Sequence, residues 1–242
     1  GFPTYHLAVV VDDVAMAITH VLRADEWLPT SPHHVQLYTV LGYDQPIWVH
    51  VPMVLNPGGH GKLSKRKTVD KDGNPTEQMV QVRQYREAGY LPEAMVNYLA
   101  LMGWAYSADQ DIFTMDEAIA RFELTDIKVS PAAWNPEKLD WMNGMYIRAL
   151  APDDLAARLV PFLAEAGIDA EPEFLARLVP LIQERMVTLR DAVPLVDFFF
   201  VPEVFPAAAD LVPRKHAPED AVRLLDAAAA TLAGAGWTAE AI

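Results

Sequence analysis

The chain has 242 residues, of which 52% are hydrophobic and 21% charged, and its formal net charge is −14. This composition is typical of one large globular domain or two ordinary ones, and it excludes a disordered chain. The acidic balance argues against indiscriminate nucleic-acid binding, because the long-range field repels phosphate, and we expect no DNA partner.

Cysteine is absent, which excludes disulfides and thiolate zinc sites. The seven histidines include no pair at metal-ligand spacing, so we expect no structural metal. No apolar run reaches the roughly 18–20 residues of a membrane span, and no secretion signal is recognisable. We therefore expect a cytoplasmic protein without a membrane partner.

The predicted elements of residues 1–52 begin with an apolar, β-branched run, L-A-V-V-V at 7–11. Such a run is typical of a strand that is buried on both faces of a parallel sheet. Asp12 and Asp13 follow it, and we expect them to cap a helix that begins with V-A-M-A-I at 14–18.

A second strand is predicted at 19–23 and a third at 47–51, which reads I-W-V-H-V. Between them, 29–42 is predicted to be a helix, with Ser31 at its N-cap and Gly42 at its end. This alternation of strands and helices indicates part of a doubly wound, Rossmann-type α/β sheet.

From about residue 76 the helical period takes over. Candidate helices span 77–88, 92–102, 115–122, 136–149, 153–166, 172–191 and 218–234. Thr114 and Glu117 have the spacing of a capping box. Ala151-Pro152 is the predicted domain boundary. The fold class is therefore α/β plus all-α.

A dense basic segment, G-K-L-S-K-R-K-T at 61–68, follows the glycine-rich stretch N-P-G-G-H-G at 56–61. Lys62 and Lys65 bracket Ser64, and a mobile loop of this kind can close its ammonium groups over a polyphosphate. On these residues alone, a solvated basic turn is an equal alternative.

The flanking motifs favour the first interpretation. K-L-S-K-R resembles the K-M-S-K-S signature of class I aminoacyl-tRNA synthetases. The segments at 1–13, 19–28, 91–104 and 139–148 are similar to glutamyl-tRNA synthetase: G-F-P-T-Y-H-L-A-V-V-V-D-D, T-H-V-L-R-A-D-E-W-L, L-P-E-A-M-V-N-Y-L-A-L-M-G-W and L-D-W-M-N-G-M-Y-I-R. Five motifs in order are far more specific than one basic hexamer.

The resemblance implies a central fragment of such an enzyme. Residues 1–52 would be the second half of the catalytic domain, 53–150 the connector that contacts the tRNA stem, and 151–242 part of a helical anticodon-binding region. The family's N-terminal H-I-G-H half is missing from the sequence, so we expect the isolated chain to form no adenylate. The family is typically monomeric.

The activity that the resemblance implies is ligation of glutamate to its tRNA through glutamyl-adenylate, with ATP and Mg²⁺ as substrate. Lys62 and Lys65 would neutralise the triphosphate in the transition state. Ser64 would hold the turn of the loop or contact ATP.

Four further residues match substrate-binding positions of the family. Arg23 would hold a carboxylate of glutamate through its bidentate guanidinium, and Tyr5 would hydrogen-bond the amino acid. Glu26 and Trp27 would line the nucleoside pocket of ATP. Trp27 as packing and Tyr5 as an anchor of the sheet are the alternatives. At position 9 the family commonly has an asparagine that helps to bind the amino acid, whereas this chain has Val9.

Contacts with tRNA phosphates are predicted more weakly, because each cation taken singly is more often a surface charge. The candidates are Arg66, Lys67, Arg83, Arg86, Lys128, Lys138 and Arg148. His6 and His20 are interpreted as structural. Two other functions stay open: a glutaminyl-tRNA synthetase, disfavoured by the helical C-terminal part, and a non-catalytic tRNA-binding protein derived from a synthetase.

Overall fold

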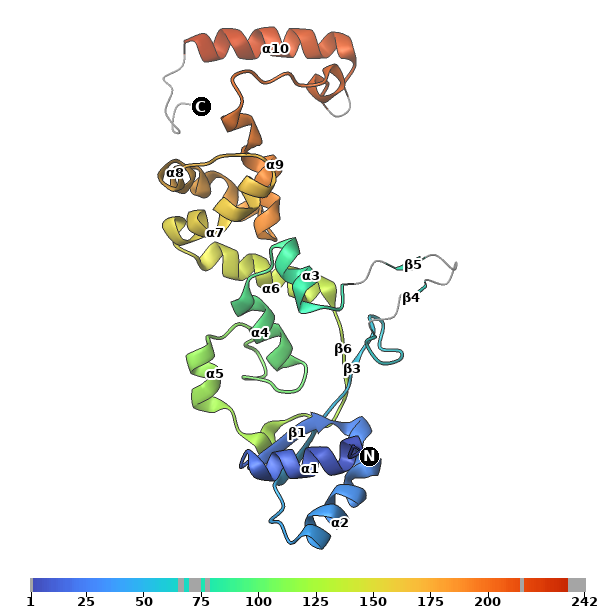
Figure 1. The fold of residues 1–242 in the computed structure, drawn as a ribbon. Helices are drawn as coiled ribbons and strands as arrows, with labels where there is room; N and C mark the ends of the chain where they lie inside the picture. Colours follow the sequence, from blue (N-terminus) through green and yellow to red (C-terminus); the bar gives the residue numbers. More distant parts are fainter. Residues whose placement is uncertain (1, 65–67, 70–74, 77–78, 214–215, 235–242) are drawn as a thin grey trace. The chain divides into compact units, whose positions relative to one another are not determined.

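The computed structural model describes residues 2–64, 68–69, 75–76, 79–213 and 216–234 (Figure 1). Its internal contacts divide the chain into two compact units, Gly1–Val196 and Asp197–Ile242, which are described separately below. Lys65, Arg66 and Lys67, three of the predicted site residues, lie outside the described residues.

The first unit begins with two parallel strands, β1 (His20–Ala24) and β2 (Ile47–Val51). Their register places Arg23 of β1 opposite His50 of β2. Both strands agree with the sequence-based prediction to within a residue at each end. Because alternate side chains of a strand share a face, Trp48 and His50 lie on one face of β2.

Two helices accompany this pair of strands. Helix α1 (Tyr5–Ala15) packs against α2 (Ser31–Leu41), and the 3-10 helix η1 (Asp25–Thr30) leads from β1 into α2. Helix α2 was predicted correctly, although Thr30 rather than Ser31 occupies its N-cap position. Gly42 ends the helix in the left-handed region, at φ 72°.

The predicted strand at 7–11 is wrong, because these residues lie inside α1. Val10 is buried, at 1% exposure, so packing against the rest of the unit outweighs the β preference of the Val9–Val11 run. Asp12 and Asp13 consequently lie near the C-terminal end of α1 and cap no following helix. The predicted helix at 14–18 is also absent, since α1 ends at Ala15 and Ala17 adopts a left-handed φ of 56°.

A short parallel pair, β3 (Val54–Leu55) with β6 (Ala132–Ala133), lies between the β1–β2 pair and the helices that follow. Figure 1 shows the two strands side by side. Beyond the glycine-rich loop, β4 (Thr68–Val69) and β5 (Pro75–Thr76) pair in antiparallel fashion.

Helices α3 (Val82–Ala88), α4 (Pro92–Leu101), α5 (Met115–Arg121) and α6 (Pro136–Ala149) form the next part of the unit. The predicted capping box of Thr114 and Glu117 is confirmed at the start of α5. The core beneath these helices is a cluster of aromatic and aliphatic side chains: Tyr85, Met95, Tyr98, Leu101, Trp104, Phe113, Trp134, Leu139 and Met142.

Helix α3 begins later than predicted. The backbone N–H groups of Val80 and Gln81 both donate to the Gln84 side chain, at 3.0 Å each, which fixes the helix start at Val82. Residues 77–78 of the predicted helix lie outside the described residues.

Helices α7 (Pro152–Glu165), α8 (Pro172–Ile182) and α9 (Ala192–Val196) complete the first unit. The single helix predicted over 172–191 is wrong beyond Ile182. There the chain forms the 3-10 helices η3 (Gln183–Arg185) and η4 (Leu189–Asp191). The Asp191 carboxylate accepts from the N–H groups of Val187 and Thr188, at 2.9 and 2.8 Å, and so begins a new helical turn.

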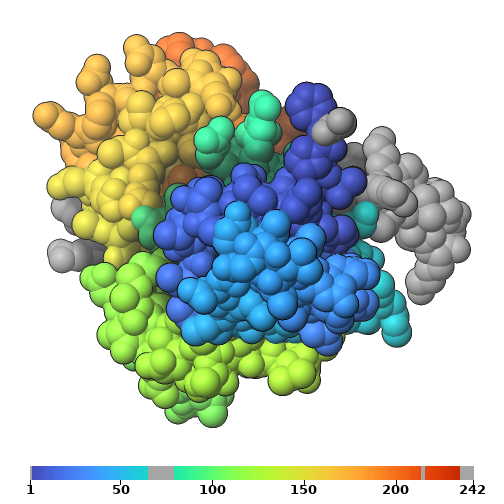
Figure 2. Space-filling model, turned by 60° about the horizontal axis from the view of Figure 1, so that its bottom comes forward, coloured from blue at the N-terminus to red at the C-terminus, as the bar shows by residue number. Residues whose placement is uncertain are grey.

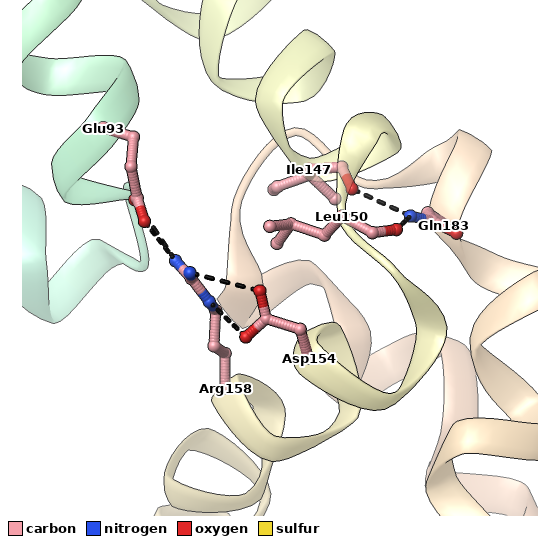
Figure 3. Close-up of polar contacts among 6 residues, drawn as sticks. All are labelled: Glu93, Ile147, Leu150, Asp154, Arg158 and Gln183. Carbon is pink, nitrogen blue, oxygen red and sulfur yellow. Dashed lines mark hydrogen bonds and ion pairs between the residues drawn. The ribbon is translucent and has the colours of Figure 1, made fainter. Parts of the chain in front are cut away.

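Polar contacts join α7 and α8 to the helices before them (Figure 3). Gln183 donates to the carbonyl oxygens of Ile147 and Leu150, at 2.8 and 2.9 Å, and thereby satisfies the C-terminal end of α6. Arg158 contacts Asp154 within α7 and Glu93 at the start of α4. Specific hydrogen bonds and an ion pair therefore connect α4 and α6, before residue 151, to α7 and Gln183, after it.

The second unit contains the 3-10 helices η5 (Asp197–Phe200) and η6 (Ala208–Leu211) and the helix α10 (Pro218–Ala233). Beyond Ala133, the part of the chain that the structure describes contains no strand. Among the described residues, no helix is both long and apolar enough to cross a membrane.

Candidate active site

The guanidinium of Arg23 is the centre of a polar cluster formed by β1, β2 and α2. Its Nε donates to His50 Nε2 at 3.2 Å, its Nη2 to Ser31 Oγ at 2.6 Å, and its Nη1 to His34 Nδ1 at 2.9 Å. The register of β1 and β2 brings His50 to Arg23, and α2 supplies Ser31 and His34 from its first turn.

Aromatic rings frame the same guanidinium. The Cζ atom of Arg23 lies 4.6 Å from the ring centroid of Trp48, which is a cation–π distance. The His34 ring stacks on Trp48, with an interplanar angle of 7° and 5.8 Å between centroids. These contacts hold Arg23 against β2 from a second side.

Arg23 has neutral hydrogen-bond partners only. Within the described ranges, no carboxylate lies at ion-pair distance from its guanidinium. Burial lowers the pKa of Arg23, whereas the nearby Tyr5 phenol and the Asp13 carboxylate raise it. A partly buried cation whose described protein partners are all neutral is suited to take a carboxylate or phosphate.

The titratable neighbours respond to the same environment. Burial, together with the charge of Arg23, lowers the pKa values of both His34 and His50. Burial raises the pKa of Asp13, and the adjacent Asp12 raises it further. The two imidazoles are thereby kept neutral beside the guanidinium.

Tyr5 and Val9 lie one turn apart on α1 and hence on one face of that helix. The Tyr5 ring contacts the ring of Trp27 in η1, with 5.3 Å between centroids. Val9 is partly buried. The structure therefore brings Tyr5, Trp27 and Arg23 to the carboxyl end of β1, where ligands bind in open α/β folds.

The glycine-rich loop is closed at its base. Leu55 and Lys62 form an isolated antiparallel bridge, and the Asn56 N–H donates to the Gly61 carbonyl at 2.9 Å. Gly58, Gly59 and Gly61 have φ values of 87°, 80° and 70°, a region that residues with a Cβ rarely adopt. This backbone explains why the stretch before Lys62 is rich in glycine.

Lys62 links the loop to the 3-10 helix η1. Its Nζ contacts both carboxylate oxygens of Glu26, at 2.6 and 2.7 Å, and Glu26 lies in η1 beside Trp27. Figure 2 shows the surface formed by the first 50 residues, with the cyan segment that contains this loop at its edge. Ser64 is partly buried.

The predicted tRNA contacts are scattered and differ in character. Arg83 pairs with Glu87 on α3, and Lys138 pairs with Asp111. The Arg148 guanidinium folds over Gly144, where an added Cβ would lie 3.0 Å from its Nη1. Arg86 and Lys128 are exposed.

Ser31, His34 and His50 are site residues that sequence reasoning missed. His50 lies in a strand that was predicted, but its pairing with Arg23 follows from the register of β1 and β2, which a single sequence does not reveal. His6 is hydrogen-bonded to His34 and His20 to Thr19, both at 2.9 Å, and their structural role stays a prediction.

Comparison with known proteins identifies the family. Residues 1–141 match the sequence model of the catalytic domain of class I tRNA synthetases for glutamate and glutamine, and residues 154–242 match an anticodon-binding domain. The chain belongs to the class I tRNA synthetases. The resemblance noted from its motifs is thus confirmed, as is the combination of a catalytic domain with a helical anticodon-binding part.

Individual relatives of this synthetase chain agree. It is 45% identical to the glutamate–tRNA ligase of Chloroflexus aurantiacus, over 100% of the chain and 48% of the relative. It is 46% identical to that of Herpetosiphon aurantiacus, over 93% of the chain and 44% of the relative. The chain therefore spans about half the length of the curated relatives it matches.

A solved structure shares the fold. The crystal structure of a glutamate–tRNA ligase from Elizabethkingia meningosepticum, in complex with its amino acid, matches with a TM-score of 0.71 and 34% identity. The match covers 93% of this chain and 46% of that one.

Proposed function

We propose that this chain is part of an enzyme that ligates glutamate to its tRNA. The observation that carries the proposal is Arg23, a partly buried guanidinium with neutral partners only, lying beside Tyr5 and Trp27 at the carboxyl end of β1. A fixed cation at this position suits a substrate with a carboxylate side chain better than one with an amide, which favours glutamate over glutamine.

In the proposed reaction, the α-carboxylate oxygen of glutamate attacks the α-phosphorus of ATP in line. A new P–O bond forms, the bond to the β-phosphate bridging oxygen breaks, and pyrophosphate leaves with the bonding electron pair. A terminal ribose hydroxyl of the tRNA then attacks the activated carbonyl, loses its proton and releases AMP. The chain's residues contribute positioning and charge neutralisation rather than covalent chemistry.

The proposed roles are those that the family resemblance implies, and the contacts of Arg23, Tyr5, Trp27 and Glu26 support them. Arg23 and Tyr5 hold the amino acid, and Trp27 and Glu26 line the nucleoside pocket. Lys62 and Lys65 neutralise the triphosphate, with Ser64 between them in the loop, and the Mg²⁺ ion would arrive with ATP as part of that substrate. Val9 stands where a polar contact to the amino acid is common in the family, so we expect the remaining contacts to supply that affinity.

The partners that we propose are glutamate, ATP and tRNA. Phosphate contacts by Arg66, Lys67, Arg83, Arg86 and Arg148 are proposed on charge alone. A monomeric, cytoplasmic enzyme without a DNA or membrane partner is the form we expect.

The test is ATP–pyrophosphate exchange by the full-length protein that contains this chain. We expect exchange that depends on glutamate and on glutamate tRNA, and that is lost in Lys65→Ala. Exchange with glutamine in place of glutamate would favour the glutaminyl alternative. No exchange with either amino acid would favour a non-catalytic tRNA-binding protein.

A further inference from the structure

The contacts of Arg23 fix the protonation of the groups around it. A guanidinium is a donor only, so each nitrogen that faces it must be an acceptor. His34 therefore presents an unprotonated Nδ1 and His50 an unprotonated Nε2. In the neutral rings, the protons are then on His34 Nε2 and His50 Nδ1.

The direction of donation continues beyond His34. Its protonated Nε2 lies 2.9 Å from His6 Nδ1 and donates to it. A chain of donors thus runs from Arg23 through His34 to His6, across β1, α2 and α1. Reversing any one of these bonds would place two N–H groups face to face.

Donor counting shows what this arrangement leaves available. The guanidinium has five N–H groups, and one on each nitrogen is used by His50, His34 and Ser31. Among the described residues no further acceptor takes a hydrogen bond from Nη1 or Nη2, so one N–H remains on each. The two nitrogens share Cζ, and a donor on each is what a bidentate carboxylate takes.

We propose that His34 and His50 are positioning residues for Arg23, whose unprotonated nitrogens hold the guanidinium so that its two remaining N–H groups stay available to the substrate carboxylate. This inference rests on the proposed function, because it assumes that Arg23 binds the amino acid. Neither imidazole is required to touch the substrate.

Protonation would undo the arrangement. An imidazolium turns its acceptor into a donor and adds a positive charge beside Arg23. The charged and titratable groups that face His34 are Arg23, His6 and His33, with Trp48 stacked on its ring. Those that face His50 are Arg23 and Asp25, with the Ser31 hydroxyl at 3.4 Å. Only Asp25 favours the charged form of His50, and no carboxylate does so for His34 among these groups.

The experiment uses matched substitutions in the full-length protein that contains this chain. His50→Gln keeps an acceptor near the Nε2 position and His34→Asn keeps one near Nδ1, whereas His50→Leu and His34→Leu remove it. His20→Leu, on the same strand as Arg23, is the control for a histidine outside the network.

The kinetic result expected is a split between the two kinds of substitution. The leucine variants raise the KM for glutamate by about 10- to 100-fold, the cost of one hydrogen bond to a charged group, with a much smaller change in kcat. The Gln and Asn variants recover most of that loss. The wild-type KM rises only below the ordinary imidazole pKa of about 6.5, because the pKa values of both histidines are lowered, and the rise is reduced in the Gln and Asn variants because an amide does not titrate.

A second measurement distinguishes this inference from the proposed function. Selective ¹⁵N labelling of histidine reports which ring nitrogen is protonated, independently of activity. Unprotonated His34 Nδ1 and His50 Nε2 support the network even if no exchange activity is found. The opposite tautomers overturn the inference, and so would leucine variants with unchanged KM and pH profile in an otherwise active enzyme.

Discussion

The Nζ atom of Lys62 lies 2.6 Å and 2.7 Å from the two carboxylate oxygens of Glu26. This contact joins the base of the glycine-rich loop to the 3-10 helix that follows β1. Both side chains are substantially exposed, at 54% and 40%, so the pair contributes at most about 1 kcal/mol to stability. Its significance is that a cation from the loop is held at the candidate site before any phosphate binds.

The first prediction concerns Lys62→Ala. In the full-length protein that contains this chain, we expect the rate of ATP–pyrophosphate exchange to fall by about 100-fold, because a group that stabilises transition-state charge is lost. The free energy of unfolding should change by less than about 1 kcal/mol, as measured by urea denaturation. Arg223→Ala, which removes an exposed ion pair with Asp220 in the second unit, is the control. An unchanged exchange rate in Lys62→Ala would contradict the assigned role.

The second prediction concerns Gly89→Ala. Gly89 has a φ of 90°, and an added Cβ would lie 2.8 Å from Arg190 N and 2.9 Å from Leu189 N, both backbone atoms. Backbone shift and left-handed strain together should cost about 2–4 kcal/mol of unfolding free energy. Gly42→Ala has a similar φ of 72° but open space around its Cβ, so it should cost only about 1–2 kcal/mol. Equal losses in the two variants would show that the contact with residues 189–190 does not form.

The third prediction concerns the buried Asn143→Ala. Asn143 accepts from the Leu91 N–H at 2.8 Å and donates to the Val187 carbonyl at 2.5 Å. Its loss leaves the buried Leu91 N–H without its partner and removes the part-buried hydrogen bond to the Val187 carbonyl, at a cost of about 2–4 kcal/mol. Asn135→Ala removes only the N-cap of α6 and should cost about 1 kcal/mol. Urea denaturation of both variants compares the two costs. If Asn143→Ala lost less unfolding free energy than Asn135→Ala, the two hydrogen bonds of Asn143 would not form as described.

The fourth prediction concerns acid stability. The pKa of His34 is lowered in the folded protein by burial and by the charge of Arg23, whereas in the unfolded chain it returns to about 6.5. The unfolded state therefore binds more protons around this pH, and stability falls as the pH drops below about 6.5. The stability that the neutral His34 contributes is fully present above about pH 6.5. In His34→Asn the slope of unfolding free energy against pH between about 5 and 7 should be smaller. A slope that is unchanged would mean that His34 does not stay neutral.

Much of the secondary structure could be predicted from local signals. Pro136 and Asn135 mark the start of α6, and Thr114 with Glu117 marks that of α5, because caps act within one turn. The run at 7–11 was mispredicted because β-branched residues favour a strand locally, whereas contacts with α2 stabilise a helix there. The predicted boundary at Ala151-Pro152 stays a prediction. The family matches divide the chain between 141 and 154, whereas its contacts divide it between 196 and 197.

The candidate site was predicted only where a residue matched a motif. Arg23, Tyr5, Glu26, Trp27 and Lys62 were predicted in this way. In the structure the Tyr5 ring contacts Trp27, and Lys62 pairs with Glu26. The imidazoles of His34 and His50 were not found, because strand register and helix packing bring them to Arg23 from 11 and 27 residues away.

The most direct test of the account is the KM for glutamate of Arg23→Lys in the full-length protein, measured by tRNA-dependent ATP–pyrophosphate exchange. Lysine keeps the charge but loses the planar fork, so we expect the KM to rise by about 10-fold or more with the KM for ATP unchanged. Arg177→Lys, an exposed arginine on α8, should leave both constants unchanged. A glutamate KM in Arg23→Lys equal to that of the wild type would contradict the claim that Arg23 binds the substrate carboxylate.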